Sequence, residues 1–209
     1  MPALTPSQIE VICRRTIGHY DTHAEDFWLG TRDHDVSQNI AALLEAIRGE
    51  PPYRILDLGC GPGRDLITLS RAGHLPTGLD GSQELCRLAR GNASCPVLHQ
   101  DFLALDLPLD HFHGVFANAS LFHVPSQELP TVLETLRDAL MAGGVLFSSN
   151  PRGNNVEGWN HDRFGAYHDL DAWTAFLTQA GFSPIGHYYR PSGVPREQQP
   201  WLASTWRKR

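Results

Sequence analysis

The chain has 209 residues, a length that suits one α/β domain with a buried core. Its net charge is −6, and the basic run at residues 207–209 is too short to suggest a nucleic-acid partner. No run of about 18 apolar residues is present to span a membrane. Residues 1–6 lack the charged and apolar regions of a signal peptide, so we expect a cytoplasmic protein without membrane partners.

Cysteine and histidine were both considered as metal ligands. The four cysteines include no C-x-x-C pair, which favours reduced thiols. Eleven histidines is a high count, but His111 and His113 lie in a polar loop and lack carboxylate or cysteine neighbours at ligand spacing. We therefore expect histidines on the surface and in polar networks, and no metal site.

Residues 1–50 are predicted to form a helical cap ahead of the first strand. Ser7 and Glu10 fit a capping box, which places the first helix over residues 8–17. The apolar face over residues 40–47 predicts a further helix. Between them, residues 32–39 are dense in polar side chains and fit either a solvated loop or the lining of a substrate pocket.

An abrupt change of pattern occurs at residues 54–65. The apolar run 54–58 predicts a buried strand, and Gly59, Gly61 and Gly63 follow at alternate positions before a helical pattern begins. Glycine has no Cβ, so the backbone can take positive φ and approach a ligand closely. The helix that follows directs free N–H groups to the same place. This order of elements predicts a ligand site.

Three acidic residues indicate which ligand this site binds. The glycine spacing G-x-G-x-G, with Asp57 two residues ahead, departs from the dinucleotide fingerprint, and no P-loop lysine follows. Asp80 ends the apolar stretch 75–79, where an acid can accept hydrogen bonds from both hydroxyls of a ribose. Asp101 follows a strand-like run and can accept from an adenine amino group, while Phe102 can cover the ring.

Together these motifs resemble the ordered motif set of class I S-adenosylmethionine-dependent methyltransferases, in particular their small-molecule, tellurite-resistance-like branch. The resemblance covers about residues 53–182. It implies S-adenosylmethionine as cofactor and S-adenosylhomocysteine as product. It also implies an α/β, Rossmann-like doubly wound fold, with a seven-stranded mostly parallel sheet in the order 3-2-1-4-5-7-6 and strand 7 antiparallel. We expect one domain over residues 1–209, with the cap at 1–50 and the core at 51–209.

The remaining chain contains patterns for the other elements of this fold. Ser82 and Ser126 are predicted to cap helices, the second of which ends at Gly143 and Gly144. Strands are predicted over residues 112–119, 145–149, 182–190 and 201–206, a polar loop over 150–155, and a helix over 171–181.

The resemblance also assigns cofactor contacts. Tyr20 lies in a segment similar to the leading segment of many small-molecule methyltransferases, where the tyrosine covers the methionine end of the cofactor and the segment forms a lid. Plain packing of the cap is the alternative. Arg64 can pair with the cofactor's carboxylate, or it is an exposed arginine in the first helical turn. The full predicted set is Tyr20, Asp57, Gly59, Gly61, Arg64, Asp80, Gly81, Ser82, Asp101, Phe102 and Asn118.

His123 is the predicted catalytic residue. It follows the strand at 112–119, in the loop that faces the methyl group in this family, and the near-neutral pKa of histidine suits proton transfer. A histidine that packs against the next helix is the alternative. Alignment can contribute roughly 7–11 kcal/mol to methyl transfer. A base adds about 10²–10⁴-fold in rate, and only where the acceptor loses a proton.

The loop from Asn118 to Leu121 lacks the motif of enzymes that methylate nucleobase amino groups. The paired glutamates of protein arginine methyltransferases and the metal ligands of catechol-type enzymes are also missing. We expect a small polar soluble acceptor, favouring a nitrogen of an amino-acid-like or imidazole metabolite such as a thiol-histidine derivative, with arginines holding its carboxylate. The predicted substrate contacts are Trp28, Arg32, His34, Gln38, Asn150, Arg152, Tyr167 and Arg196.

Two other functions stay open from the sequence. The branch resemblance allows an S-, Se-, Te- or O-directed acceptor, although four dispersed cysteines do not indicate a soft-atom site. A non-catalytic sensor that keeps the S-adenosylmethionine pocket is the alternative from another class. We expect a monomer or a homodimer.

Overall fold

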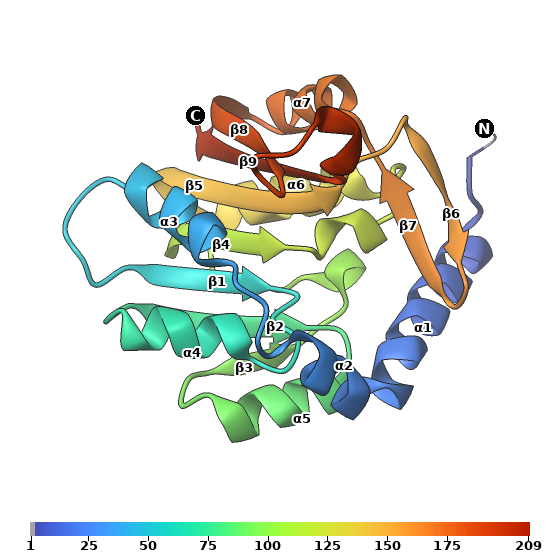
Figure 1. Cartoon of the computed structure of the whole chain (residues 1–209), viewed down its shortest axis with the longest axis horizontal. Coiled ribbons are helices and arrows are strands. Elements are labelled where there is room, and N and C mark those ends of the chain that lie inside the picture. The colour runs from blue at the N-terminus through green and yellow to red at the C-terminus, as the bar shows by residue number, and fades with distance from the viewer. Residues whose placement is uncertain (1–2) are drawn as a thin grey trace.

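A twisted seven-stranded sheet runs through the centre of the molecule (Figure 1). The structure is a computed structural model that describes residues 3–209. In spatial order the strands are β3 (Val97–His99), β2 (Leu75–Asp80), β1 (Arg54–Leu58), β4 (Phe112–Asn118), β5 (Leu140–Pro151), β9 (Trp201–Lys208) and β8 (Phe182–Arg190).

Strand β9 is antiparallel to both β5 and β8, and the other pairs in the sheet are parallel. The Rossmann-like fold class is confirmed. The strand labels differ from the predicted order 3-2-1-4-5-7-6 because a separate two-stranded sheet, β6 (Val156–Asn160) with β7 (Arg163–Tyr167), was not predicted and precedes the last two strands.

Helices cover both faces of the sheet and its carboxyl edge (Figure 1). They are α1 (Pro6–Thr22), α2 (Ala24–Thr31), α3 (Ser37–Ala46), α4 (Arg64–Arg71), α5 (Gln83–Asn92), α6 (Leu129–Ala139) and α7 (Leu170–Gln179), with single 3₁₀ turns η1 (Phe102–Ala104), η2 (Leu121–His123) and η3 (Arg196–Gln198). None of the helices within residues 3–209 has the length and apolar character needed to cross a membrane.

Strand β1 is buried on both faces, as expected for the centre of a parallel sheet. Leu56 and Leu58 pack in the cluster that α6 and α7 complete, whereas Ile55 packs in the cluster built with α3 and Leu69 of α4. The sheet is therefore held rigidly between two apolar layers, and its carboxyl edge provides a fixed base for a site.

The first helix begins earlier than predicted and extends further. Thr5 is its N-cap, and the capping box forms between Thr5 and Gln8 instead of Ser7 and Glu10. Pro6 stands in the first helical position, where its missing N–H costs nothing. The longer helix reaches Thr22, which carries Tyr20 over the end of the sheet.

The predicted bounds of α6 were also wrong. Glu128 is its N-cap, while the Ser126 backbone N–H and hydroxyl both donate to the carboxylate of Glu157. The helix ends before Gly143 because Leu140 already pairs with Phe112 in the sheet, so strand pairing outweighs the helical pattern.

Asn150 and Pro151 belong to β5, where they pair with Leu202 and Trp201, and not to the predicted loop. The β6–β7 hairpin that follows turns at His161, which takes a positive φ of 54°. This turn lacks the Asn-Gly or Asp-Gly pair that would have signalled a hairpin from sequence. The hairpin lies beside α1, on the same side of the molecule as the carboxyl edge (Figure 1).

Candidate active site

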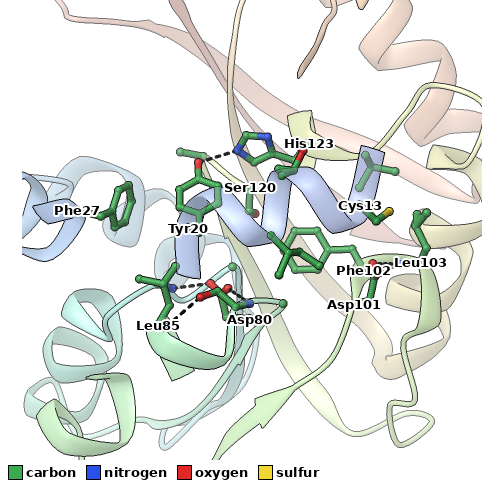
Figure 2. Close-up of a pocket in the computed structure, with 18 of the residues that line it drawn as sticks. Cys13, Tyr20, Phe27, Asp80, Leu85, Asp101, Phe102, Leu103, Ser120 and His123 are labelled. Carbon is green, nitrogen blue, oxygen red and sulfur yellow. Dashed lines mark hydrogen bonds between the residues drawn. The ribbon is translucent and has the colours of Figure 1, made fainter. Parts of the chain in front are cut away.

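A pocket lies where α1 crosses the carboxyl edge of the sheet (Figure 2). Its floor comes from the turns after β1, β2 and β3, and its roof from α1, α2 and the segment after β4. The lining residues are Cys13, Thr16, Ile17, Tyr20, Phe27, Gly59, Gly61, Asp80, Gly81, Ser82, Leu85, Asp101, Phe102, Leu103, Ala119, Ser120, His123, Val124 and Pro125.

The glycine turn places backbone without side chains at the floor of the pocket. Gly59, Gly61 and Gly63 all have positive φ, at 74°, 52° and 92°. A Cβ at Gly59 would overlap the Cβ of Ser120, so that position has no room for a side chain. The amides of Gly59 and Cys60 donate to the carbonyl of Leu79 at 2.7 and 3.0 Å, which fixes the turn against β2.

Asp80 stands at the end of β2, only 9% exposed, and faces the pocket (Figure 2). Its Oδ2 accepts from the amide of Gly61 and its Oδ1 from the amide of Ser82, both at 2.9 Å. Burial raises the pKa of this carboxyl, while the backbone N–H groups of Ser82, Gly61 and Gly81 act in the opposite direction. The carboxylate is therefore held in one orientation by the turns that surround it.

Two buried polar atoms beside the glycine turn have no hydrogen-bond partner within residues 3–209. One is Oδ2 of Asp57, whose residue is 2% exposed, and the other is the hydroxyl of Ser120. Burial and the nearby Asp65 and Asp80 raise the pKa of Asp57, against the opposing charge of Arg64. Because unpaired buried polar atoms are costly, this arrangement suits a polar ligand in the pocket.

Asp101 and Phe102 form the far end of the floor. Oδ1 of Asp101 accepts from the amide of Leu103 at 2.9 Å, and this bond starts the η1 turn that positions Phe102. Cys13 of α1 lies against Asp101; burial, and then this carboxylate, raise the pKa of its thiol to about 12. Asp101 and Phe102 thus lie where the sequence predicted an adenine site, and Cys13 is an added neighbour.

Tyr20 and His123 meet at the roof (Figure 2). The Tyr20 hydroxyl lies 2.9 Å from Nε2 of His123, and Nδ1 of His123 lies 2.6 Å from the carbonyl oxygen of Phe164. A carbonyl can only accept, so Nδ1 carries the hydrogen and Nε2 accepts from Tyr20. Burial lowers the pKa of His123 to about 4, and burial raises that of Tyr20. The pair is therefore neutral at ordinary pH.

Three predicted cofactor contacts lie outside the lining, namely Asp57, Arg64 and Asn118. The guanidinium of Arg64 donates to both oxygens of Asp65 at 2.7 and 2.8 Å and to the carbonyl of Thr31 at 2.9 Å. The guanidinium that was predicted to bind the cofactor's carboxylate therefore binds the carboxylate of Asp65. Asn118 accepts from the side chain of Asn39 at 2.8 Å and belongs to a polar network under α3.

The eight predicted substrate contacts are also absent from the lining, and each of the three arginines is engaged elsewhere. Arg32 pairs with Asp33 at the surface, Arg152 donates to the carbonyl of Arg196, and the guanidinium of Arg196 lies 3.2 Å from the ring centre of Tyr189. The other five are Trp28, His34, Gln38, Asn150 and Tyr167.

Residues 32–39 pack toward β8 instead of the pocket. Arg190 donates to the carbonyl of Asp35 at 3.0 Å, and Tyr188 donates to Oδ1 of Asn39 at 2.8 Å. Of the two interpretations that the sequence left open for this segment, the structure supports a loop that packs on the sheet edge.

Several lining residues were missed. Cys13, Thr16 and Ile17 share one face of α1 with Tyr20, at the spacing of three, four and seven residues that marks a single helical face. This spacing was visible in the sequence, but the ligand that it faces was not. Ser120 was read only as part of a loop motif.

The sheet order, the glycine turn and the acid at the end of β2 define the fold of class I S-adenosylmethionine-dependent methyltransferases. Residues 55–144 match the family described as "Methyltransferase domain". Within residues 3–209, no group of three or more His, Cys, Asp or Glu side chains is arranged to hold a metal ion.

Solved structures with the same fold come from several kinds of protein. The Burkholderia thailandensis 1,6-didemethyltoxoflavin-N1-methyltransferase, solved with 1,6-didemethyltoxoflavin and S-adenosylhomocysteine, matches with a TM-score of 0.78 at 22% identity, over 100% of this chain and 92% of that chain. The [4+2]-cyclase SpnF matches with a TM-score of 0.75 at 16% identity, over 94% of this chain and 96% of that chain. These identities show the shared fold alone.

The curated relatives match shorter stretches. Malonyl-[acyl-carrier protein] O-methyltransferase of Erwinia pyrifoliae is 36% identical over 118 residues, which cover 55% of this chain and 44% of that protein. The chain matches less than half the length of each curated relative reported for it.

Proposed function

We propose that this protein is an S-adenosylmethionine-dependent methyltransferase that acts on a small polar acceptor, with a nitrogen nucleophile favoured. The observation that carries the proposal is the convergence of the glycine turn, Asp80, Asp101 and the Tyr20–His123 pair on one pocket. The methyltransferase-domain match over residues 55–144 supports it. We further propose that residues 1–209 act as one unit.

The floor of the pocket fits the cofactor. Asp80 would accept from the ribose hydroxyls, Asp101 from the adenine amino group, and Phe102 would cover the ring. The unpartnered atoms of Asp57 and Ser120 would serve the polar methionine end. When bound, S-adenosylmethionine supplies a methyl group from a cationic sulfonium, whose charge is lost as S-adenosylhomocysteine forms.

The Tyr20–His123 pair can move a proton from the acceptor. The acceptor's N–H gives its proton to the hydroxyl oxygen of Tyr20, while Tyr20 gives its own hydrogen to Nε2 of His123. The Nδ1 hydrogen stays on the imidazole ring and keeps its hydrogen bond to the carbonyl oxygen of Phe164. Protonated His123 then replaces the charge that is lost on methyl transfer, so the net charge of the pocket does not change.

The nitrogen preference is supported by the N1-methyltransferase with the same fold. An S-, Se-, Te- or O-directed acceptor is the alternative, and the O-methyltransferase relative supports oxygen. The predicted recognition of a carboxylate by Arg32, Arg152 and Arg196 loses its basis, since all three are engaged outside the pocket. A cytoplasmic location and a monomeric or homodimeric state stay predictions.

Isothermal titration calorimetry tests the cofactor assignment. We expect the purified protein to bind S-adenosylmethionine and S-adenosylhomocysteine, and to bind NAD far more weakly. An acid at the end of β2, such as Asp80, would suit the ribose of either cofactor, so NAD is the sharpest competitor. Equal or tighter binding of NAD would contradict the proposal.

A further inference from the structure

The hairpin residues Arg163, Gly165 and Tyr167 share one face of β7. Successive side chains of a strand alternate, and the intervening Phe164 and Ala166 are buried on the other face. A Cβ at Gly165 would lie 2.5 Å from the hydroxyl of Tyr167. The Tyr167 ring therefore lies along the strand over Gly165, which places its hydroxyl toward Arg163.

This face of β7 lies beside Tyr20 and His123, the pair proposed to move the acceptor's proton. The peptide of Phe164 bonds on both sides: its N–H donates to the hydroxyl of Thr16 at 3.0 Å, and its carbonyl accepts from His123. These two bonds hold β7 against α1 and against η2. Burial raises the pKa of Tyr20, the guanidinium of Arg163 opposes that rise, and Tyr167 adds to it.

The hairpin has an arginine whose charge is not matched. Arg163 forms no ion pair with any carboxylate within residues 3–209. The adjacent acid, Asp162, already pairs with Arg15 at 2.8 Å, and Arg15 also lies 4.5 Å from the ring centre of Trp159.

The neighbouring histidines supply no negative charge to match that of Arg163. Nδ1 of His19 is buried without a partner, and its ring stacks on His23 at 4.5 Å. Burial, His23 and Arg163 all lower the pKa of His19. These histidines therefore do not offset the charge of Arg163, and the adjacent acid, Asp162, is paired with Arg15.

We propose that Arg163 and Tyr167 bind a carboxylate of the methyl acceptor, next to Tyr20 and His123. A planar guanidinium matches a carboxylate with two parallel hydrogen bonds, and a phenol hydroxyl can add a third. Tyr20 and His123 line the pocket while Arg163 and Tyr167 do not, so the pair joins the pocket to this subsite. This inference rests on the proposed function. The sequence also predicted that an arginine would bind a carboxylate of the acceptor, but it predicted other arginines than Arg163.

Paired probes that differ only in charge test this subsite. The protein is saturated with S-adenosylhomocysteine, and ligand-observed NMR then measures binding of imidazole-4-acetate against imidazole-4-acetamide, and of benzoate against benzamide. We expect at least one carboxylate to bind about tenfold tighter than its amide. Arg163→Gln removes that preference, and Tyr167→Phe reduces it.

Arg14→Gln is the matched control, because Arg14 is an exposed α1 arginine whose partner is Glu10. It keeps the preference for the carboxylate. An absence of any carboxylate preference in the wild-type protein, or its persistence in Arg163→Gln, overturns the assignment. Loss of S-adenosylhomocysteine binding is recorded before any probe is added, so failure of the cofactor site is distinguished from failure of the subsite.

Discussion

The floor and the roof of the pocket are held together in different ways. On the floor, the contacts involve backbone amides from neighbouring turns: Gly59 with the Leu79 carbonyl, and Gly61 with Asp80. On the roof, side chains of α1 bond to segments that are distant in sequence. The separations are 103 residues for Tyr20 and His123, 148 for Thr16 and Phe164, and 61 for Asp21 and Ser82.

This difference indicates what each wall can do. The floor cannot change without breaking the turns between strands, so it suits a ligand of constant shape. The roof is attached through a few hydrogen bonds that each contribute about 0.5–1.5 kcal/mol net. Local opening of α1 and the hairpin should therefore cost less than unfolding of the sheet. We expect the floor to determine cofactor binding and the roof to determine acceptor entry and choice.

The largest expected effect on stability comes from adding a side chain to the glycine turn in the floor. Gly59→Ala combines a positive φ with a Cβ that overlaps Ser120, and we expect a loss of about 2–4 kcal/mol in stability, together with loss of cofactor binding. Gly91→Ala in α5 is the control, because nothing lies within 4 Å of its added Cβ. Thermal unfolding and calorimetry compare the two. Normal cofactor affinity in Gly59→Ala would show that the floor tolerates change.

His123 makes the roof sensitive to acid. Its pKa is about 4 in the folded protein, below the ordinary value of 6.5. Between these two pH values, the imidazole is therefore protonated in the unfolded chain but not in the folded chain. This contribution to the free energy of unfolding is complete above about pH 6.5 and falls by up to about 3 kcal/mol as the pH drops to about 4.

Denaturant titrations at several pH values measure this difference. His123→Gln should lose less stability than the wild-type protein between pH 6.5 and pH 4, whereas the exposed His187→Gln should follow the wild type. Parallel curves for wild type and His123→Gln would contradict a buried neutral imidazole.

A smaller change on the floor tests the ribose contact. Asp80→Asn should weaken binding of S-adenosylhomocysteine by about 1–3 kcal/mol, because a charged acceptor is lost. Asp33→Asn is the control, since its side chain is 86% exposed. Calorimetry that finds equal affinities for Asp80→Asn and the wild type would remove Asp80 from the cofactor site.

The smallest effect should come from the roof. Thr16→Val removes the acceptor of the Phe164 amide and should cost about 1 kcal/mol. Hydrogen exchange should then quicken in α1 and β7 but not in β1. Thr135→Val on the outer side of α6 is the control. Faster exchange in β1 as well would show that roof and floor open together. It would contradict the expectation that α1 and the hairpin open at a lower free-energy cost than the sheet.

The contrast between the floor and the roof also explains which site residues the sequence could predict. Gly59, Asp80 and Asp101 lie at strand ends, so their spacing alone predicted that they would share one edge of the sheet. Thr16 and Arg163 act through contacts between α1 and a hairpin that had no turn signal, and the sequence could not show which segments meet. The sequence also did not show that the guanidinium of Arg64 donates to its neighbour Asp65.

Mass spectrometry of labelled products tests the central claim most directly. The purified protein is incubated with a small-molecule cell extract and S-adenosylmethionine that carries a CD₃ group. We expect the label to move to a metabolite with a nitrogen nucleophile, and we expect Tyr20→Phe and His123→Gln to slow the transfer while still binding S-adenosylhomocysteine. Tight cofactor binding with no labelled metabolite in any extract would contradict methyl transfer and favour a sensor.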